Sequence, residues 1–157
     1  METIWQELSF GFNDTQQVIR VAIRLIAAII LGAVIGFERE RAGKDAGLRT
    51  HILVTLGTCS VVLACTGFEM SVEGVSRVVQ GIVTGIGFIG AGSILKVSHQ
   101  GDIKGLTTAA GLWMTCAIGV AVGLGEIGLA LMCSLLTLIV LGLLGRVEAI
   151  ANPDKGD

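Results

Sequence analysis

Residues 85–92 read GIGFIGAG, and they lie in a run from Val78 to Leu95 that contains no Asp, Glu, Lys or Arg. The first six residues satisfy G-x-G-x-x-G, the pattern of a loop that binds a dinucleotide in a soluble βαβ unit. That interpretation needs an acidic residue about 20 positions further on, whereas the first one downstream, Asp102, comes too soon and lies in a predicted loop. The dinucleotide interpretation therefore fails. Because the run approaches the roughly 20 apolar residues that cross a bilayer, it predicts a transmembrane helix.

Four further segments have the same character. The whole chain of 157 residues is 52% apolar and only 15% charged, with a mean hydropathy of +0.80, whereas a soluble domain carries about 25% charged residues. The sequence therefore predicts an all-α integral membrane protein, a bundle of five transmembrane helices. Charge-free runs occupy 52–68, 105–125 and 127–145, and residues 18–37 are equally apolar apart from Arg20 and Arg24.

Basic residues are concentrated in every second connection between the predicted spans. They occur at 38–49, at 96–104 and after residue 145. The positive-inside rule places such connections in the cytoplasm, so we expect the N-terminus outside and the C-terminus inside. The predicted organisation is an outer amphipathic tail at 1–17, a five-span membrane domain at 18–146 and a cytoplasmic tail at 147–157.

Arg20 and Arg24 are charged residues inside the first predicted span. They are four residues apart and so share one helix face. Either they reach outward to the lipid headgroups, or they point into the bundle.

Several classes of function lack support in the residues. There is no basic stripe for nucleic acid, no Ser-His-Asp arrangement and no spacing of carboxylates that defines a magnesium site. We therefore expect no enzyme and no cofactor, and any metal stays unknown. The cysteines fall inside the spans without a C-x-x-C pair, which favours a packing role; they are Cys59, Cys65, Cys116 and Cys133.

The glycines of the third predicted span suit close contact between helices. Small residues let helix backbones approach each other in a bilayer. Since these glycines cover nearly every side of the helix, we expect it to be the central helix of the bundle, and Gly85→Leu to disrupt packing. The alternative is a helix broken near 85–92 that lines a site at membrane depth. The predicted packing residues are Gly81, Gly85, Gly87, Gly90 and Gly92.

Two junctions between a basic connection and a span resemble each other. They read GLRTHILVTLGT at 47–58 and GLTTAAGLWMTC at 105–116. The match predicts two helix hairpins of the same orientation, a repeat known in transporters. Thr50 and Thr108 suit N-terminal caps, and Trp113 suits either packing or the wall of a cleft.

Polar residues gather at the predicted cytoplasmic ends of these hairpins. Glu38 is a candidate partner for Arg49. If the hairpins pack side by side, one polar cluster forms there, made of Glu38, Arg49, His51, Thr107 and Thr108. Either this is a functional cluster, or it is an interfacial salt bridge with two helix caps.

Three stretches in this order resemble the MgtC/SapB family of bacterial inner-membrane proteins. They are LGAVIGFERERAGKDAGLRTHILVTLG (31–57), SRVVQGIVTGIGFIGAGSI (76–94) and GLTTAAGLWMTCAIGVAVGLG (105–125). The resemblance implies a five-span domain in the inner membrane with a cytoplasmic C-terminus. It assigns to the family motifs Glu38, Arg39, Gly47, Arg49, Thr50 and His51, then Gln80, Gly85, Gly87 and Gly90, then Thr107, Thr108 and Trp113.

The resemblance also implies a link to growth at low magnesium. Long family members carry a soluble ACT-like domain after the last span, whereas this chain ends soon after Arg146, so the short, SapB-like members are the closer expectation. A role in membrane energetics, including restraint of the F-type ATP synthase, is attributed to a long member. We expect a non-enzymatic regulator that modulates membrane energetics or a partner complex and forms a homo-oligomer in the bilayer. The alternative is an ion transporter or channel with a pathway between the hairpins.

Overall fold

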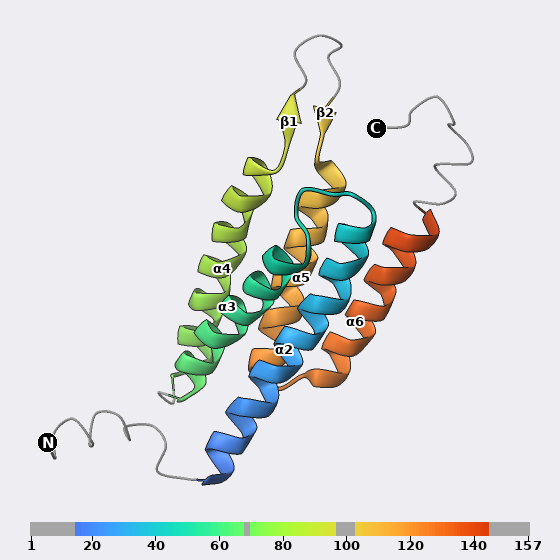
Figure 1. The fold of residues 1–157 in the computed structure, drawn as a ribbon. Coiled ribbons are helices and arrows are strands. Elements are labelled where there is room, and N and C mark those ends of the chain that lie inside the picture. The colour runs from blue at the N-terminus through green and yellow to red at the C-terminus, as the bar shows by residue number, and fades with distance from the viewer. Residues whose placement is uncertain (1–14, 68–69, 97–102, 145–157) are drawn as a thin grey trace, which may run out of the picture.

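The structure is a computed structural model that describes residues 15–67, 70–96 and 103–144 (Figure 1). Most of the predicted outer tail and all of the predicted cytoplasmic tail lie outside the described residues. The elements in chain order are α2 (Thr15–Arg41), α3 (Leu48–Gly67), α4 (Val72–Gly92), β1 (Leu95–Lys96), β2 (Ile103–Lys104), α5 (Leu106–Leu124), α6 (Ile127–Ile139) and the π-helical η1 (Val140–Leu144).

The predicted all-α membrane bundle of five apolar helices is confirmed. By length and composition, α2, α3, α4 and α5 are long and apolar enough to cross a membrane, and α6 with η1 forms a shorter apolar helix. The connection predicted between the third and fourth spans is more than a loop, because β1 and β2 pair antiparallel there. The chain is thus a multi-pass membrane protein.

The two helix hairpins run in the same direction, as the repeated junctions predicted. Figure 1 shows α2 and α4 rising toward one end, and α3 and α5 descending from it. That end holds residues 42–47 and the β1–β2 pair, and we call it the basic end, since the basic connections lie there. Which side of the membrane it faces follows from the positive-inside rule alone.

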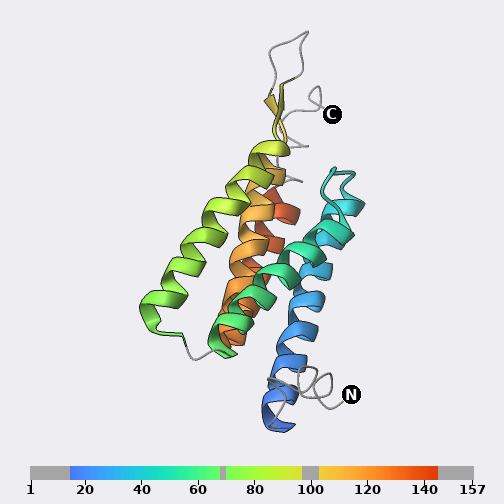
Figure 2. The ribbon, with the colours of Figure 1, turned by 90° about the vertical axis from the view of Figure 1, so that its left-hand side faces the viewer.

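The central helix of the bundle is α5. It contacts α2, α3, α4 and α6, and Figure 2 shows it between α4 on one side and α2 on the other. Over half of its most apolar stretch is buried, 56%. Its inner face joins α2 and α6 in one core, which includes Ala28, Ile35, Ile118, Val122 and Ala130.

The C-terminal end of α5 explains the charge inside the first span. Gly125 has a φ of +94°, a left-handed conformation that glycine adopts without strain and that closes a helix. Arg24 extends from α2 to this turn, where its guanidinium donates to the Gly123 carbonyl at 2.9 Å. Arg24 therefore points into the bundle and binds a free carbonyl of the helix end. Arg20 stays exposed and donates to Gln16 at 3.4 Å.

The prediction that the glycine-rich helix is central is wrong. Only 6% of the most apolar stretch of α4 is buried. An added Cβ at Gly81, Gly85, Gly87 or Gly92 would meet nothing within 4 Å among the described atoms, and at Gly90 it would meet Ala109 at 3.6 Å. A glycine permits close approach but supplies no attraction of its own, so the pattern did not decide which helix became central.

Two further expectations about this helix change with its position. Gly85→Leu has nothing to clash with in the single chain, so the expected loss of packing within the bundle is wrong. The α-helix also continues unbroken from Val72 through Gly92, which contradicts the alternative of a helix broken near 85–92.

Candidate functional site

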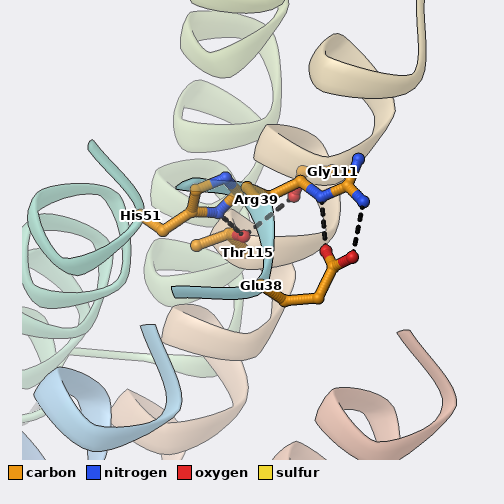
Figure 3. A network of polar contacts seen from close by, with 5 residues as sticks. All are labelled: Glu38, Arg39, His51, Gly111 and Thr115. Carbon is orange, nitrogen blue, oxygen red and sulfur yellow. Dashed lines mark hydrogen bonds and ion pairs between the residues drawn. The ribbon is translucent and has the colours of Figure 1, made fainter. Parts of the chain in front are cut away.

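Polar residues of α2, α3 and α5 gather just inside the basic end (Figure 3), and we call them the polar network. His51, in the first turn of α3, is fully buried, and its Nδ1 lies 2.7 Å from Thr115 Oγ1 of α5. The Thr115 hydroxyl donates to the Gly111 carbonyl at 2.8 Å. The contact between His51 Nδ1 and Thr115 is a hydrogen bond in either ring tautomer, because the Thr115 hydroxyl can accept from a protonated Nδ1 or donate to an unprotonated one.

The other ring nitrogen of His51, Nε2, lies outside these hydrogen bonds. Nε2 is buried and has no hydrogen-bond partner among the described residues. A buried polar atom without a partner is costly, about 1–3 kcal/mol, and calls for an explanation in a native structure. The ring thus holds one buried polar atom without a hydrogen bond at the point where three helices meet.

Glycines of α2 allow His51 to lie this deep. An added Cβ at Gly36 would come within 2.7 Å of Leu48 Cα and 3.0 Å of His51 Cβ. At Gly32 it would overlap Thr55 and the His51 carbonyl. The close approach of α2 and α3 thus depends on these two residues, which is the use of small residues between membrane helices.

An ion pair between neighbouring residues lies beside this contact. Arg39 donates from Nε to Glu38 Oε2 at 2.6 Å and from Nη2 to Glu38 Oε1 at 2.9 Å. The Arg39 side chain is 5% exposed and that of Glu38 is 25% exposed. Two parallel charge-assisted bonds neutralise a cation that would otherwise be buried alone.

The predicted polar cluster forms in part. The structure brings together Glu38, Arg39 and His51 (Figure 3), and Thr108 is buried one turn from Gly111 on the same face of α5. Thr107, Gln80 and Trp113 point away from the network: all three are exposed.

Three detailed expectations about the cluster are wrong. Glu38 binds Arg39 and not Arg49, because its neighbour in the sequence reaches both carboxylate oxygens. Thr50 does not cap α3, since the helix begins earlier, at Leu48, and the Leu48 N–H is bound by the Glu40 carboxylate at 2.8 Å. Thr108 does not cap α5, whose N-terminal cap is Gly105.

Thr115 and Glu40 are the residues that sequence reasoning missed. Thr115 lies seven residues after Thr108, two turns further along the same helix face, so the spacing could have found it. Glu40 lies just inside the end of α2, and its bond to Leu48 spans the α2–α3 connection. Neither signal stands out in the sequence, because one lies in an apolar run and the other in a charged one.

The chemistry open to the network is narrow. No group of three or more His, Cys, Asp or Glu residues that could hold a metal ion occurs in the described part of the chain. The network offers one unpartnered ring nitrogen, His51 Nε2, and a neutralised ion pair, both at the helix ends. Its hydrogen bonds link α3 to α5 through His51 and Thr115, whereas the Glu38–Arg39 pair lies within α2. Nε2 is the one atom of the network that is open to a further hydrogen-bond partner.

Comparison with known proteins matches this bundle to a family. A profile described as the MgtC family matches residues 25–150, a range that includes the network, α2 from Leu25 onward and the whole of α3, α4, α5 and α6. The chain belongs to the MgtC family. The described fold and the family assignment thus agree with the resemblance of the three sequence stretches.

Three relatives show how similar this chain is to known proteins and how much of each chain the similarity covers. Protein SrpB of Synechococcus elongatus is 39% identical over 83% of this chain and 78% of its own length. The putative magnesium transporter YhiD of Escherichia coli K12 is 47% identical over 76% of this chain and 58% of its own length. Protein MgtC of Salmonella typhimurium is 40% identical over 74% of this chain and 48% of its own length.

This chain thus spans about half to four fifths of these relatives. No solved structure matches it.

Proposed function

We propose that this MgtC-family protein is a non-enzymatic protein of the bacterial inner membrane that serves magnesium homeostasis by contact with another membrane protein. The link to magnesium is supported by its relative YhiD, named a putative magnesium transporter. The basic end faces the cytoplasm in this proposal, as the positive-inside rule favours.

The observation that carries the proposal is the close packing of α3 against α5. An added Cβ at Gly119 would overlap Thr58 and come within 2.7 Å of the Thr55 carbonyl, and at Gly123 it would meet Val62 at 2.7 Å. Backbones this close leave no room for a water-filled path between the helices. This contact counts against a path between α3 and α5 and so favours action through the surface of the bundle.

The polar residues inside the bundle support the same view. Among the described residues, Arg39 is the fully buried charge, and it is paired at the basic end. Arg24, half-buried, points into the bundle at the opposite end, where it binds the Gly123 carbonyl. Coupled transporters and pumps usually place ionisable residues along the membrane pathway. The buried hydroxyls of Thr55, Thr115, Ser134 and Thr137 each donate to a carbonyl of their own helix.

The exposed face of α4 is the surface that such a contact would use. Gly81, Gly85 and Gly92 fall on one side of this helix, given 3.6 residues per turn, and each faces open space in the single chain. Small residues in such a row suit close approach by another helix. A second copy of the chain and a larger complex such as the F-type ATP synthase are the partners to test.

A transporter is the second candidate. It is favoured by His51 Nε2, a buried ring nitrogen without a hydrogen-bond partner in the described structure, and by the same-direction hairpins. Polar atoms inside membrane bundles often mark ion or proton routes. In that case a rearrangement would have to open the contacts made by Gly119 and Gly123.

Flux in proteoliposomes separates the two candidates. We expect purified protein to show no magnesium or proton flux above protein-free vesicles, measured with entrapped dyes. Saturable flux that His51→Gln abolishes, with that variant still folded, would contradict the proposal and support transport.

Growth at low magnesium tests the contact itself in a strain that depends on this gene. We expect Gly85→Leu to impair growth although the protein still accumulates in the membrane. Gly128→Leu is the matched control, since it also faces open space but lies on α6. Equal growth of the two variants would count against the α4 face.

A further inference from the structure

A groove about 490 Å³ in volume opens between α3 and α4, away from the buried network. Its volume is in the range of about 300–1,000 Å³ typical of small-molecule sites. One wall is a row at four-residue spacing on α3, which runs from Arg49 through Leu53 and Gly57 to Val61. The other wall consists of the isoleucines of α4, and Cys116 of α5 lies at the base. Leu53, Val61 and Ile89 of its lining are exposed, so the groove opens on the outer surface of the bundle.

The polarity of the groove is uneven along its length. Arg49 and Thr50 lie at the basic end, and from Leu53 onward the lining is almost entirely apolar. Arg49 is exposed, and no ion pair joins it to a described acidic residue. Glu40 already binds the first N–H of α3, so the cation at the mouth is Arg49 and not the helix end.

The length of the groove matches one leaflet of the bilayer. From Arg49 to Val61 is 12 residues, which at 1.5 Å per residue gives about 18 Å. Half of the roughly 30 Å hydrocarbon core is about 15 Å. On α4 the lining residues are Ile82, Ile86 and Ile89, all in the half of the helix near the basic end. A partner helix would need a face along the whole span, whereas a lipid chain needs one leaflet.

From these observations we propose that the α3–α4 groove binds one anionic phospholipid, with an acyl chain along Leu53, Gly57 and Val61 and the phosphate on Arg49. A buried methylene stabilises such binding by about 0.8 kcal/mol, and basic residues beside membrane helices attract anionic headgroups. Under the orientation proposed above, this lipid belongs to the cytoplasmic leaflet.

Gly57 makes the proposal testable without damage to the fold. An added Cβ there meets nothing within 4 Å among the described atoms, so Gly57→Leu fills the groove and not the protein interior. Gly128→Leu adds the same side chain on α6, where it also meets nothing. Arg49→Gln removes the cation and leaves the apolar wall.

The experiment is native mass spectrometry of the full chain in mild detergent, titrated with phosphatidylglycerol or phosphatidylcholine. We expect one phosphatidylglycerol per chain to stay bound in the spectrometer. Gly57→Leu should lower the affinity for this lipid at least about tenfold, and Gly128→Leu should leave the affinity unchanged. Arg49→Gln should reduce the preference for phosphatidylglycerol over phosphatidylcholine by about fivefold.

Two results would overturn the lipid site. Equal lipid binding by Gly57→Leu and Gly128→Leu would mean general annular lipid only. If Gly57→Leu instead shifts the ratio of dimer to monomer while lipid binding stays constant, the groove receives a helix from a second copy. Thermal unfolding of each variant in detergent checks that the chain remains folded.

Discussion

The glycines of α2 and α5 and the glycines of α4 look alike in the sequence but do different things in the structure. At Gly32, Gly36 and Gly119 an added Cβ would overlap atoms of a neighbouring helix. At Gly85 and Gly92 it would meet nothing within the described chain. The first group holds the bundle together, and the second leaves a bare face on α4. Small residues thus mark where helices can approach, and the packed bundle decides which of these places are used.

The largest effect should follow from Gly119→Leu. Its side chain would overlap Thr58 and the backbone of Thr55, and overpacking against backbone costs at least about 3 kcal/mol, the upper end of the usual range. We expect no folded protein in the membrane fraction, measured by size-exclusion chromatography in detergent. A folded Gly119→Leu variant would mean that α3 and α5 separate easily, which would weaken the case against a pathway between them.

The buried ion pair should be the next most sensitive feature, and its two sides should differ. Glu38→Met leaves the Arg39 side chain, which is 5% exposed, as a buried charge without a partner, and such a loss costs about 3–5 kcal/mol. Arg39→Met leaves Glu38, which at 25% exposure still contacts water, so we expect a smaller cost of about 1–2 kcal/mol. Reversible unfolding in detergent measures both, and equal losses would show that Arg39 reaches solvent.

A smaller loss is expected from Thr115→Val. This change removes the hydrogen-bond partner of His51 Nδ1, and a buried polar group left without a partner costs about 1–3 kcal/mol. Thr137→Val is the matched control, since its hydroxyl bonds only to the Cys133 carbonyl of its own helix. If both valine variants lose the same stability, the His51–Thr115 contact contributes nothing of its own.

The smallest effect on stability should come from Gly85→Leu. The new side chain meets open space, and leucine favours a helix over glycine by nearly 1 kcal/mol. We expect the unfolding free energy of the single chain to stay within about 1 kcal/mol of the wild-type value. A large loss would place Gly85 against protein atoms, contrary to the structure.

The sequence predicted the helices well because a bilayer imposes a simple rule. Every backbone polar group in the hydrocarbon region needs an internal partner, so each long apolar run had to become a helix. The positions of α2 to α5 follow from this rule. The direction of the hairpins also followed, from the matched junctions at Gly47 and Gly105.

The arrangement of the helices could not be predicted in the same way. Which helices pack against each other depends on contacts between distant segments, such as Gly119 with Thr58 and Gly36 with Leu48. A single sequence does not show which distant residues will be in contact. The same limit explains the polar network. The sequence marked His51 as a candidate site residue, yet its hydrogen-bond partner Thr115 is 64 residues away. Glu38 instead pairs with Arg39, its neighbour in the sequence.

The central claim is that the bare face of α4 contacts another membrane protein. Its most direct test is photo-crosslinking in native membranes, with a benzophenone amino acid at position 85 and, as a control, at position 128. We predict that the probe at 85 gives a discrete protein adduct, identified by mass spectrometry, and that the probe at 128 gives lipid adducts alone. Lipid adducts alone at both positions would contradict the claim and show that this face of α4 meets only the bilayer.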